Sequence, residues 1–145
     1  MNIPSYSVYR KDYGKGGGVC LYVKNTLMVT ELNLNIDGQE GVEDIWISVQ
    51  HCKFPSMIVG CIYRHPKANA ESFTYIADIL KSVILRNKPL FIFGDFNDNL
   101  INIGNKMDKL VRSLKLSQVI DKPKLITPTS ATILDLVITN NKDMI

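Results

Sequence analysis

The sequence predicts an α/β domain built on a mixed β-sheet, and three observations support this class. Apolar or alternating runs of strand length recur between residues 19 and 63. A stretch with helical periodicity, 69–86, separates two apolar runs at 57–63 and 90–93. A second helical stretch and a further apolar run follow. A strand meander followed by alternating strands and helices is typical of layered α/β proteins.

The composition indicates a single globular domain. The chain has 145 residues, of which 46% are hydrophobic and 21% are charged, and this is enough for one core. We therefore treat residues 1–145 as one domain. The formal net charge of +3 is compatible with a polyanionic partner and does not require one.

The cysteines indicate the compartment. Cys20, Cys52 and Cys61 form no Cys-x-x-Cys pair, and two of them lie inside apolar runs, where a thiol behaves as a small hydrophobe. We expect a reducing compartment, and so an intracellular protein, nuclear or cytoplasmic. No apolar stretch approaches the roughly 20 residues of a membrane span, and the polar start does not resemble a signal peptide. The sequence therefore predicts no membrane partner.

The first dozen residues mix three tyrosines with Arg10 and Lys11 and lead into a glycine-rich run at 14–18. We predict a flexible loop that enters a strand over 19–23. Tyrosines interleaved with cations are also able to stack on bases, which is the weaker of the two interpretations. The triple glycine precedes a strand instead of opening a helix, so it is not a nucleotide-binding loop.

The strands before the first helix follow from their patterns. Residues 29–35 alternate as in a half-buried strand, and Asp37-Gly38 marks a turn. Residues 45–49 form the next predicted strand. Residues 57–63 are almost continuously apolar, which predicts a strand covered on both faces.

Helical spacing appears twice. Residues 69–86 place apolar side chains at intervals of three and four, with Asn69 as the expected N-cap. The apolar run 90–93 is the strand that follows. Residues 105–116 repeat the helical spacing over a shorter stretch, and 133–138 is the last predicted strand.

The segment Gly94-Asp95-Phe96-Asn97 ends the strand 90–93 and is the most informative part of the chain. Ligands in α/β sheets bind beyond the carboxyl ends of strands, so Asp95 and Asn97 are placed to form a site. Gly94 permits a sharp turn or a close backbone approach. The alternative is a local turn in which the Asp and Asn side chains bond their own backbone.

Asp135 interrupts the apolar run 133–138. Alternation along a strand would place its carboxylate on a covered face, between Ile133 and Val137. A buried unpaired charge is costly. We therefore expect Asp135 to be buried, to have a partner and to serve the function.

Tyr63 and Arg64 end the strand before the helix, as Asp95 and Asn97 end the strand after it. Parallel neighbours would bring these ends to one rim of the sheet, and we expect Asp135 to reach the same pocket. A guanidinium matches phosphate oxygens, a phenol donates a hydrogen bond, and carboxylates hold the divalent ion that offsets charge at phosphorus. The sequence thus predicts a site for a phosphate ester.

Four motifs carry a resemblance to a known superfamily. Their order and spacing resemble the endonuclease/exonuclease/phosphatase superfamily, and more narrowly the apurinic-type endonuclease domain of non-LTR (LINE-like) retrotransposons of animals. The resemblance covers about residues 6–140. The motifs are Gly16-Gly17-Gly18-Val19, Ile62-Tyr63-Arg64-x-Pro66, Gly94-Asp95-Phe96-Asn97 and Thr132-Ile133-Leu134-Asp135-Leu136-Val137.

This resemblance implies a four-layered α/β sandwich that hydrolyses a DNA phosphodiester with Mg²⁺ or Mn²⁺. The nick would prime reverse transcription, so the implied partners are DNA and a fused reverse transcriptase. Asp95 would orient or deprotonate the attacking water, Asn97 and Tyr63 would contact the scissile phosphate, and Asp95 and Asn97 would lie at the metal. Asp135 would orient the catalytic histidine, and Arg64 would contact DNA.

The chain departs from that family in two places. It has no glutamate on a strand before the glycine-rich segment and no Ser-Asp-His at its end. Neither His51 nor His65 matches the family histidine. His65 is interpreted as a loop residue, and His51 has no acidic neighbour. We therefore expect an incomplete domain, truncated at both ends, with weak or no turnover.

Three alternatives remain open. A phosphatase or sphingomyelinase-like hydrolase of the same fold would act on inositol or lipid phosphates. A catalytically silent remnant would bind DNA without metal and with steep salt dependence. A chain without an opening and a closing strand would expose sheet edges and aggregate.

Overall fold

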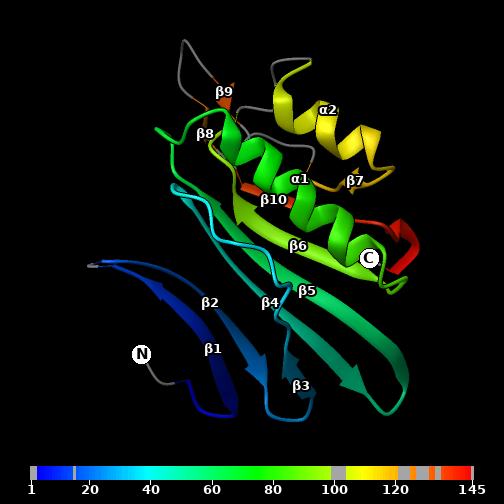
Figure 1. Cartoon of the computed structure of the whole chain (residues 1–145). Coiled ribbons are helices and arrows are strands. Elements are labelled where there is room, and N and C mark those ends of the chain that lie inside the picture. The colour runs from blue at the N-terminus through cyan, green and yellow to red at the C-terminus, as the bar shows by residue number, and fades with distance from the viewer. Residues whose placement is uncertain are drawn as a thin grey trace.

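A six-stranded mixed sheet forms the centre of the protein (Figure 1). The computed structural model describes residues 3–14, 16–98, 104–120, 125–126, 131–132 and 135–144. The strand order in the sheet is β3-β4-β5-β6-β10-β7. Helix α1 covers one face, and the β1–β2 hairpin packs against β4 and β5 on the other side. The predicted α/β class and mixed sheet are confirmed.

The N-terminal segment forms a hairpin instead of the predicted loop. Strand β1 (Tyr6–Tyr13) pairs antiparallel with β2 (Gly17–Lys24) over its whole length. Pairing satisfies the backbone of both segments, and Tyr9 and Tyr13 turn to the half-buried side. The loop prediction was wrong because it weighed the charges of this segment above the strand preference of its tyrosines and valine.

Strands β3 (Met28–Glu31), β4 (Val42–His51) and β5 (Phe54–Arg64) form an antiparallel meander. The predicted strand over 29–35 ends early, and the chain runs irregularly to a turn that includes Gly41 instead of Gly38. Gly41 has φ +81°, and a Cβ there would lie 2.8 Å from the Ala68 side chain. Only glycine fits that position, so the turn forms there.

A strand, helix, strand unit follows as predicted. Helix α1 (Glu71–Ile84) connects β5 to β6 (Leu90–Asp95), and the two strands are parallel. The N-cap is Ala70, which makes no side-chain cap bond, instead of the expected Asn69. Asn69 stands one residue earlier, and its side chain accepts a hydrogen bond from the Ser72 backbone N–H at 3.2 Å.

The second half of the chain adds one helix and short strands. Helix α2 (Lys106–Ser113) begins at Asn105, whose side chain accepts a hydrogen bond from the Asp108 backbone N–H at 2.7 Å. Strand β10 (Asp135–Thr139) pairs antiparallel with β6 and with β7 (Ser117–Gln118). The remaining elements are the separate pair β8 (Leu125–Ile126) and β9 (Ala131–Thr132), and the 3₁₀ turn η1 (Lys142–Met144).

The core lies between the sheet and its two helices. Alternate strand residues such as Ile62, Ile92 and Ile138 are fully buried there with the apolar side of α1. On the other face the intervening residues of β5 are only half-buried, and Phe93 of β6 is 41% exposed. The prediction that β5 is covered on both faces is therefore wrong for the described part of the chain. No helix in that part is long and apolar enough to span a membrane.

Candidate active site

Four polar side chains line up across the open face of the sheet. Glu43 of β4 pairs with Tyr63 of β5, Tyr63 with Asp95 of β6, and Asp95 with Asp135 of β10. Residues paired directly across strands project to the same face. We call Glu43, Tyr63, Asp95 and Asp135 the acidic rung. It lies opposite α1, because the alternate residues of the same strands form the helix-covered core.

Three of these residues are those that the sequence predicted to converge. The structure brings Tyr63, Asp95 and Asp135 into neighbouring positions at one end of the sheet. Gly94 makes this approach possible, since a Cβ there would overlap the Ile62 carbonyl oxygen. A glycine at this position therefore lets β5 and β6 pair up to the rung.

Asp95 and Asn97 are fixed by a local turn. The Asp95 carboxylate accepts a hydrogen bond from the Asn97 backbone N–H at 2.9 Å, and Asn97 has φ +47°. The Asn97 side-chain amide donates to the Arg64 carbonyl oxygen at 2.8 Å. The turn that the sequence offered as an alternative to a site is thus present. It also holds the Asp95 carboxylate in one orientation while the side chain stays half-exposed.

The expectation that Asp135 is buried is wrong. Asp135 is the first residue of β10 and is exposed. Its face of the sheet is open at this end, so its carboxylate carries no burial penalty. The rung position of Asp135, rather than its burial, is what connects it to Asp95. Positions 133 and 134 of the predicted strand lie outside the described residues.

The expectation that Arg64 faces DNA is also wrong. Its side chain lies on the α1 face, is 7% exposed, and donates to the Ser72 hydroxyl at 2.7 Å and the Ala68 carbonyl at 2.9 Å. The guanidinium lies 4.2 Å from the centre of the Phe73 ring. Burial lowers the pKa of Arg64 and the Asp98 carboxylate opposes that shift. Arg64 therefore anchors α1 to the end of β5.

Glu43 is a rung residue that sequence reasoning missed. A Cβ on Gly17 would lie 2.7 Å from Glu43 Oε1, so the glycine-rich start of β2 lets the hairpin pass closely over this carboxylate. The available signal was that Glu43 stands two residues before the predicted strand 45–49, whose start the structure extends to Val42. Its neighbour across the sheet depends on the β4–β5 register, which local patterns do not specify.

The described donors do not make a complete Mg²⁺ or Mn²⁺ site. In the part of the chain that the structure describes, no three Asp, Glu, His or Cys side chains are grouped to hold a metal ion. The bonds from the Asn97 backbone N–H to Asp95 and from the Asn97 amide nitrogen to the Arg64 carbonyl leave the Asp95 carboxylate and Asn97 Oδ1 as two oxygen donors, which is fewer than a metal ion needs. We therefore assign no chemical step to a metal on these residues alone.

Comparison with known proteins identifies the fold. No protein-family model matches the chain, and a search of curated proteins finds no match. Among solved structures, an endonuclease/exonuclease/phosphatase family protein from Bacteroides thetaiotaomicron superposes with TM-score 0.68 at 12% identity, over 95% of this chain and 60% of that one.

Two further structures have the same fold. A mannosyl-6-phosphatase from the same organism matches with TM-score 0.68 at 11% identity, over 97% of this chain and 64% of that one. ANGEL2, a 2′,3′-cyclic phosphatase, matches with TM-score 0.62 at 12% identity, over 95% and 63%. The chain therefore has the fold of the endonuclease/exonuclease/phosphatase superfamily, as the motifs predicted. It spans less than two thirds of the length of these three proteins.

Proposed function

We propose that the chain is part of a divalent-metal-dependent phosphodiester hydrolase that nicks DNA, and that the acidic rung receives the scissile phosphate. The observation that carries this proposal is the alignment of Tyr63, Asp95 and Asp135 in register on one open face. The four-motif resemblance supports the narrower proposal, the endonuclease domain of an intracellular, nuclear or cytoplasmic, non-LTR retrotransposon protein with a fused reverse transcriptase.

The rung residues have distinct roles in this proposal. The Tyr63 phenol donates a hydrogen bond to a non-bridging phosphate oxygen. Asp95 orients a water molecule and takes its proton as the water oxygen attacks phosphorus and the bond to the leaving sugar oxygen breaks. Asn97 holds the phosphate beside Asp95. The resemblance gives Asp135 the role of orienting a histidine that matches neither His51 nor His65.

The charge of the rung explains why turnover by residues 1–145 should be weak. Glu43, Asp95 and Asp135 bring three carboxylates to one row, and like charges repel an incoming phosphate. A divalent cation offsets that repulsion when it is bound. Asp95 and Asn97 are the two ligands that we propose for it, and the described residues supply no complete site.

The test is a plasmid-nicking assay with residues 1–145 in Mg²⁺ or Mn²⁺ and in EDTA. We expect at most slow nicking that EDTA and Asp95→Asn both abolish. Asp37→Asn is the matched control, because Asp37 is exposed in the loop before β4. Fast nicking that needs Asp95 would contradict the weak turnover. Slow nicking that is insensitive to Asp95→Asn would contradict the assigned site.

A phosphatase of the same fold is the second candidate. Two proteins that share the fold are named as phosphatases, one for mannosyl-6-phosphate and one for 2′,3′-cyclic phosphate. Phosphate monoesters and inositol phosphates belong in the same assay for this reason. Release of phosphate from them, with intact plasmid, would favour the phosphatase. DNA binding that needs no metal and yields no product would favour the silent remnant.

A further inference from the structure

A cavity of about 650 Å³ adjoins the acidic rung. It is bounded by the end of β1, the turn before β4 and the loop after β5, and its lining includes Tyr13, Glu40, Glu43, His65, Lys67 and Asn69. Glu43 belongs both to this lining and to the rung. The cavity therefore opens beside the position proposed for the scissile phosphate.

His65 presents a hydrogen-bond donor at this edge. Its ring stands edge-on to the Tyr63 ring, with 6.3 Å between the ring centres. Its Nδ1 accepts a hydrogen bond from the Lys67 backbone N–H at 3.3 Å, so Nε2 carries the proton of the neutral ring. The backbone is fixed as well, because the His65 N–H donates to the Gly41 carbonyl at 2.8 Å. The imidazole and the Tyr63 phenol are thus neighbouring donors.

Lys67 adds a positive charge to the same wall. Its side chain is exposed, and within the described residues it takes part in none of the ion pairs, which join Arg10 to Asp12, Lys81 to Asp78 and Arg112 to Asp108. An ammonium without an acidic partner is available to a phosphate.

The β4 side of the cavity carries acceptors. Gln39, Glu40 and Glu43 line the cavity on the side of the turn before β4. Carboxylates repel phosphate but accept hydrogen bonds from base amino groups. A nucleotide with its phosphate near His65 and Lys67 and its base toward Glu40 would place donors against the phosphate and acceptors against the base. The cavity volume exceeds what one phosphate needs.

We propose that this cavity binds the nucleotide next to the reacting phosphate, with His65 and Lys67 holding its phosphate group. One DNA strand carries a phosphate about every 3.4 Å of helix axis, so donors 6.3 Å apart at their ring centres reach neighbouring phosphates. This inference rests on the proposed function and narrows it. The substrate is a polynucleotide with consecutive phosphates and not a monoester.

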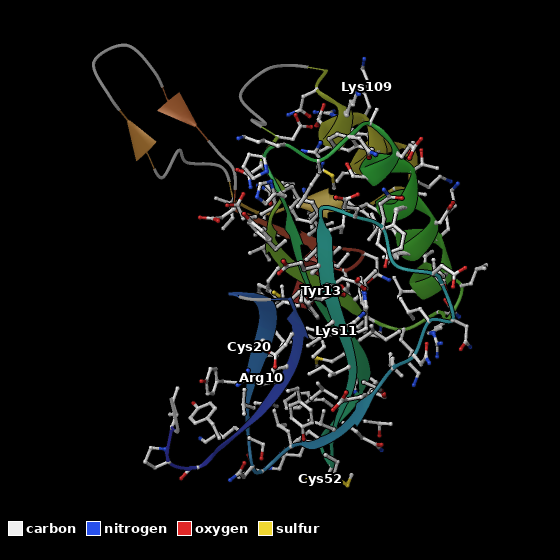
Figure 2. The ribbon with its side chains drawn as sticks, turned by 60° about the vertical axis from the view of Figure 1, so that its left-hand side comes forward. Arg10, Lys11, Tyr13, Cys20, Cys52 and Lys109 are labelled. Atoms are coloured by element: carbon white, nitrogen blue, oxygen red, sulfur yellow. The ribbon has the colours of Figure 1, made fainter. Side chains whose placement is uncertain are left out.

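The chain contains its own control for this site. His51 and Lys53 repeat the local geometry, since the Lys53 backbone N–H donates to His51 Nδ1 at 3.2 Å. They flank Cys52 in the β4–β5 turn, which Figure 2 shows at the far end of the sheet from Tyr13 of the cavity wall. The two pairs share their chemistry and differ in their distance from the rung.

The experiment measures binding of a fluorescent DNA oligonucleotide to residues 1–145 as a function of salt. We expect H65Q/K67Q to bind about tenfold more weakly, and the slope of log K against log salt to fall by roughly 0.7–0.9 for each lost phosphate contact. H51Q/K53Q should bind as the unaltered chain does. Equal binding by the two double variants, whether both match the unaltered chain or both lose the same affinity, would overturn the inference.

NMR gives a second readout that needs no variant. The chain has two histidines, and we expect only the His65 ring signals to shift when the oligonucleotide is added. A shift of similar size with a mononucleotide would overturn the polynucleotide assignment. If the unaltered chain binds no DNA, the proposed function itself fails. If it binds DNA with the His65 signals unmoved, only the cavity assignment fails.

Discussion

Tyr63 and Arg64 are consecutive residues of β5, yet they belong to two different regions of the molecule. Tyr63 lies on the open face of the sheet in the acidic rung, whereas Arg64 is buried under α1 with three hydrogen-bonded contacts. The difference arises because successive strand residues point to opposite faces. Of these two adjacent polar residues, Arg64 therefore stabilises the fold and Tyr63 faces the proposed site.

The two faces also differ in burial. Ile92 is fully buried on the α1 face, and its neighbour Phe93 is 41% exposed on the rung face. Among the described residues, the apolar contacts that stabilise the fold concentrate on the helix side. Substitutions on that side should change stability, and substitutions on the rung side should change ligand binding.

The largest loss of stability should come from Gly94→Ala, because both faces of the sheet depend on the pairing of β5 with β6. The added Cβ would overlap the Ile62 carbonyl oxygen, and backbone atoms cannot move away without separating β5 from β6. We expect a loss of more than about 4 kcal/mol in the free energy of unfolding. Urea titration followed by circular dichroism measures it. Gly38→Ala, where a Cβ meets nothing within 4 Å, should change little, and a tolerated Gly94→Ala would contradict the strand geometry.

Ile92→Ala and Phe93→Ala compare the faces directly. Truncating fully buried Ile92 should cost about 3–4 kcal/mol, because it loses apolar contacts and leaves a cavity. Truncating Phe93, whose ring is 41% exposed, should cost about 1 kcal/mol or less. The same urea titration applies to both variants. Equal losses would show that a further layer covers the rung face in solution.

Arg64→Met and Tyr63→Phe sharpen the comparison at neighbouring positions. Arg64→Met leaves the Ala68 carbonyl and the Ser72 hydroxyl without their charged donor, and we expect a loss of about 2 kcal/mol in stability. Tyr63→Phe should leave stability within about 0.5 kcal/mol and weaken oligonucleotide binding severalfold. Melting curves and binding isotherms for both variants measure this. The reversed pattern would refute the division of the two faces.

The smallest expected effect is a loss of stability at alkaline pH. Tyr75 is buried on the α1 side, where burial and the nearby Asp44 carboxylate raise its pKa, and its hydroxyl donates to Asp44 at 3.1 Å. The folded chain keeps this proton where the unfolded chain releases it. The stability that the Tyr75 proton contributes is therefore complete below about pH 10, and it is lost as pH rises further, through the pKa of the folded state.

Tyr75→Phe should reduce this alkaline loss, measured as unfolding midpoints in urea between pH 8 and 11.

On the rung face, burial raises the pKa of the Cys61 thiol, with Cys20 adding to the shift. Cys61→Ala is the matched variant and should remove a separate loss that begins near pH 8.5. An alkaline transition that neither variant alters would contradict both assignments.

The sequence anticipated most of the elements. Period-two and helical spacing located β4, β5, α1, β6 and α2, because these patterns record which side of an element is buried. The same patterns failed for β1, whose charges resembled a loop until β2 paired with it. They also placed the turn before β4 too early, since local spacing does not reveal that Gly41 has a positive φ and approaches Ala68 too closely for a side chain.

For the site, the sequence by itself determined which groups stand at strand ends, namely Tyr63, Asp95 and Asn97. Only the tertiary structure decided which of the neighbouring polar residues face one another, because register and sheet order depend on pairing between segments distant in the chain. That pairing brought Glu43 into the acidic rung and placed Asp135 at an exposed strand start. It also set Arg64 beneath α1, since a strand turns alternate side chains to opposite faces.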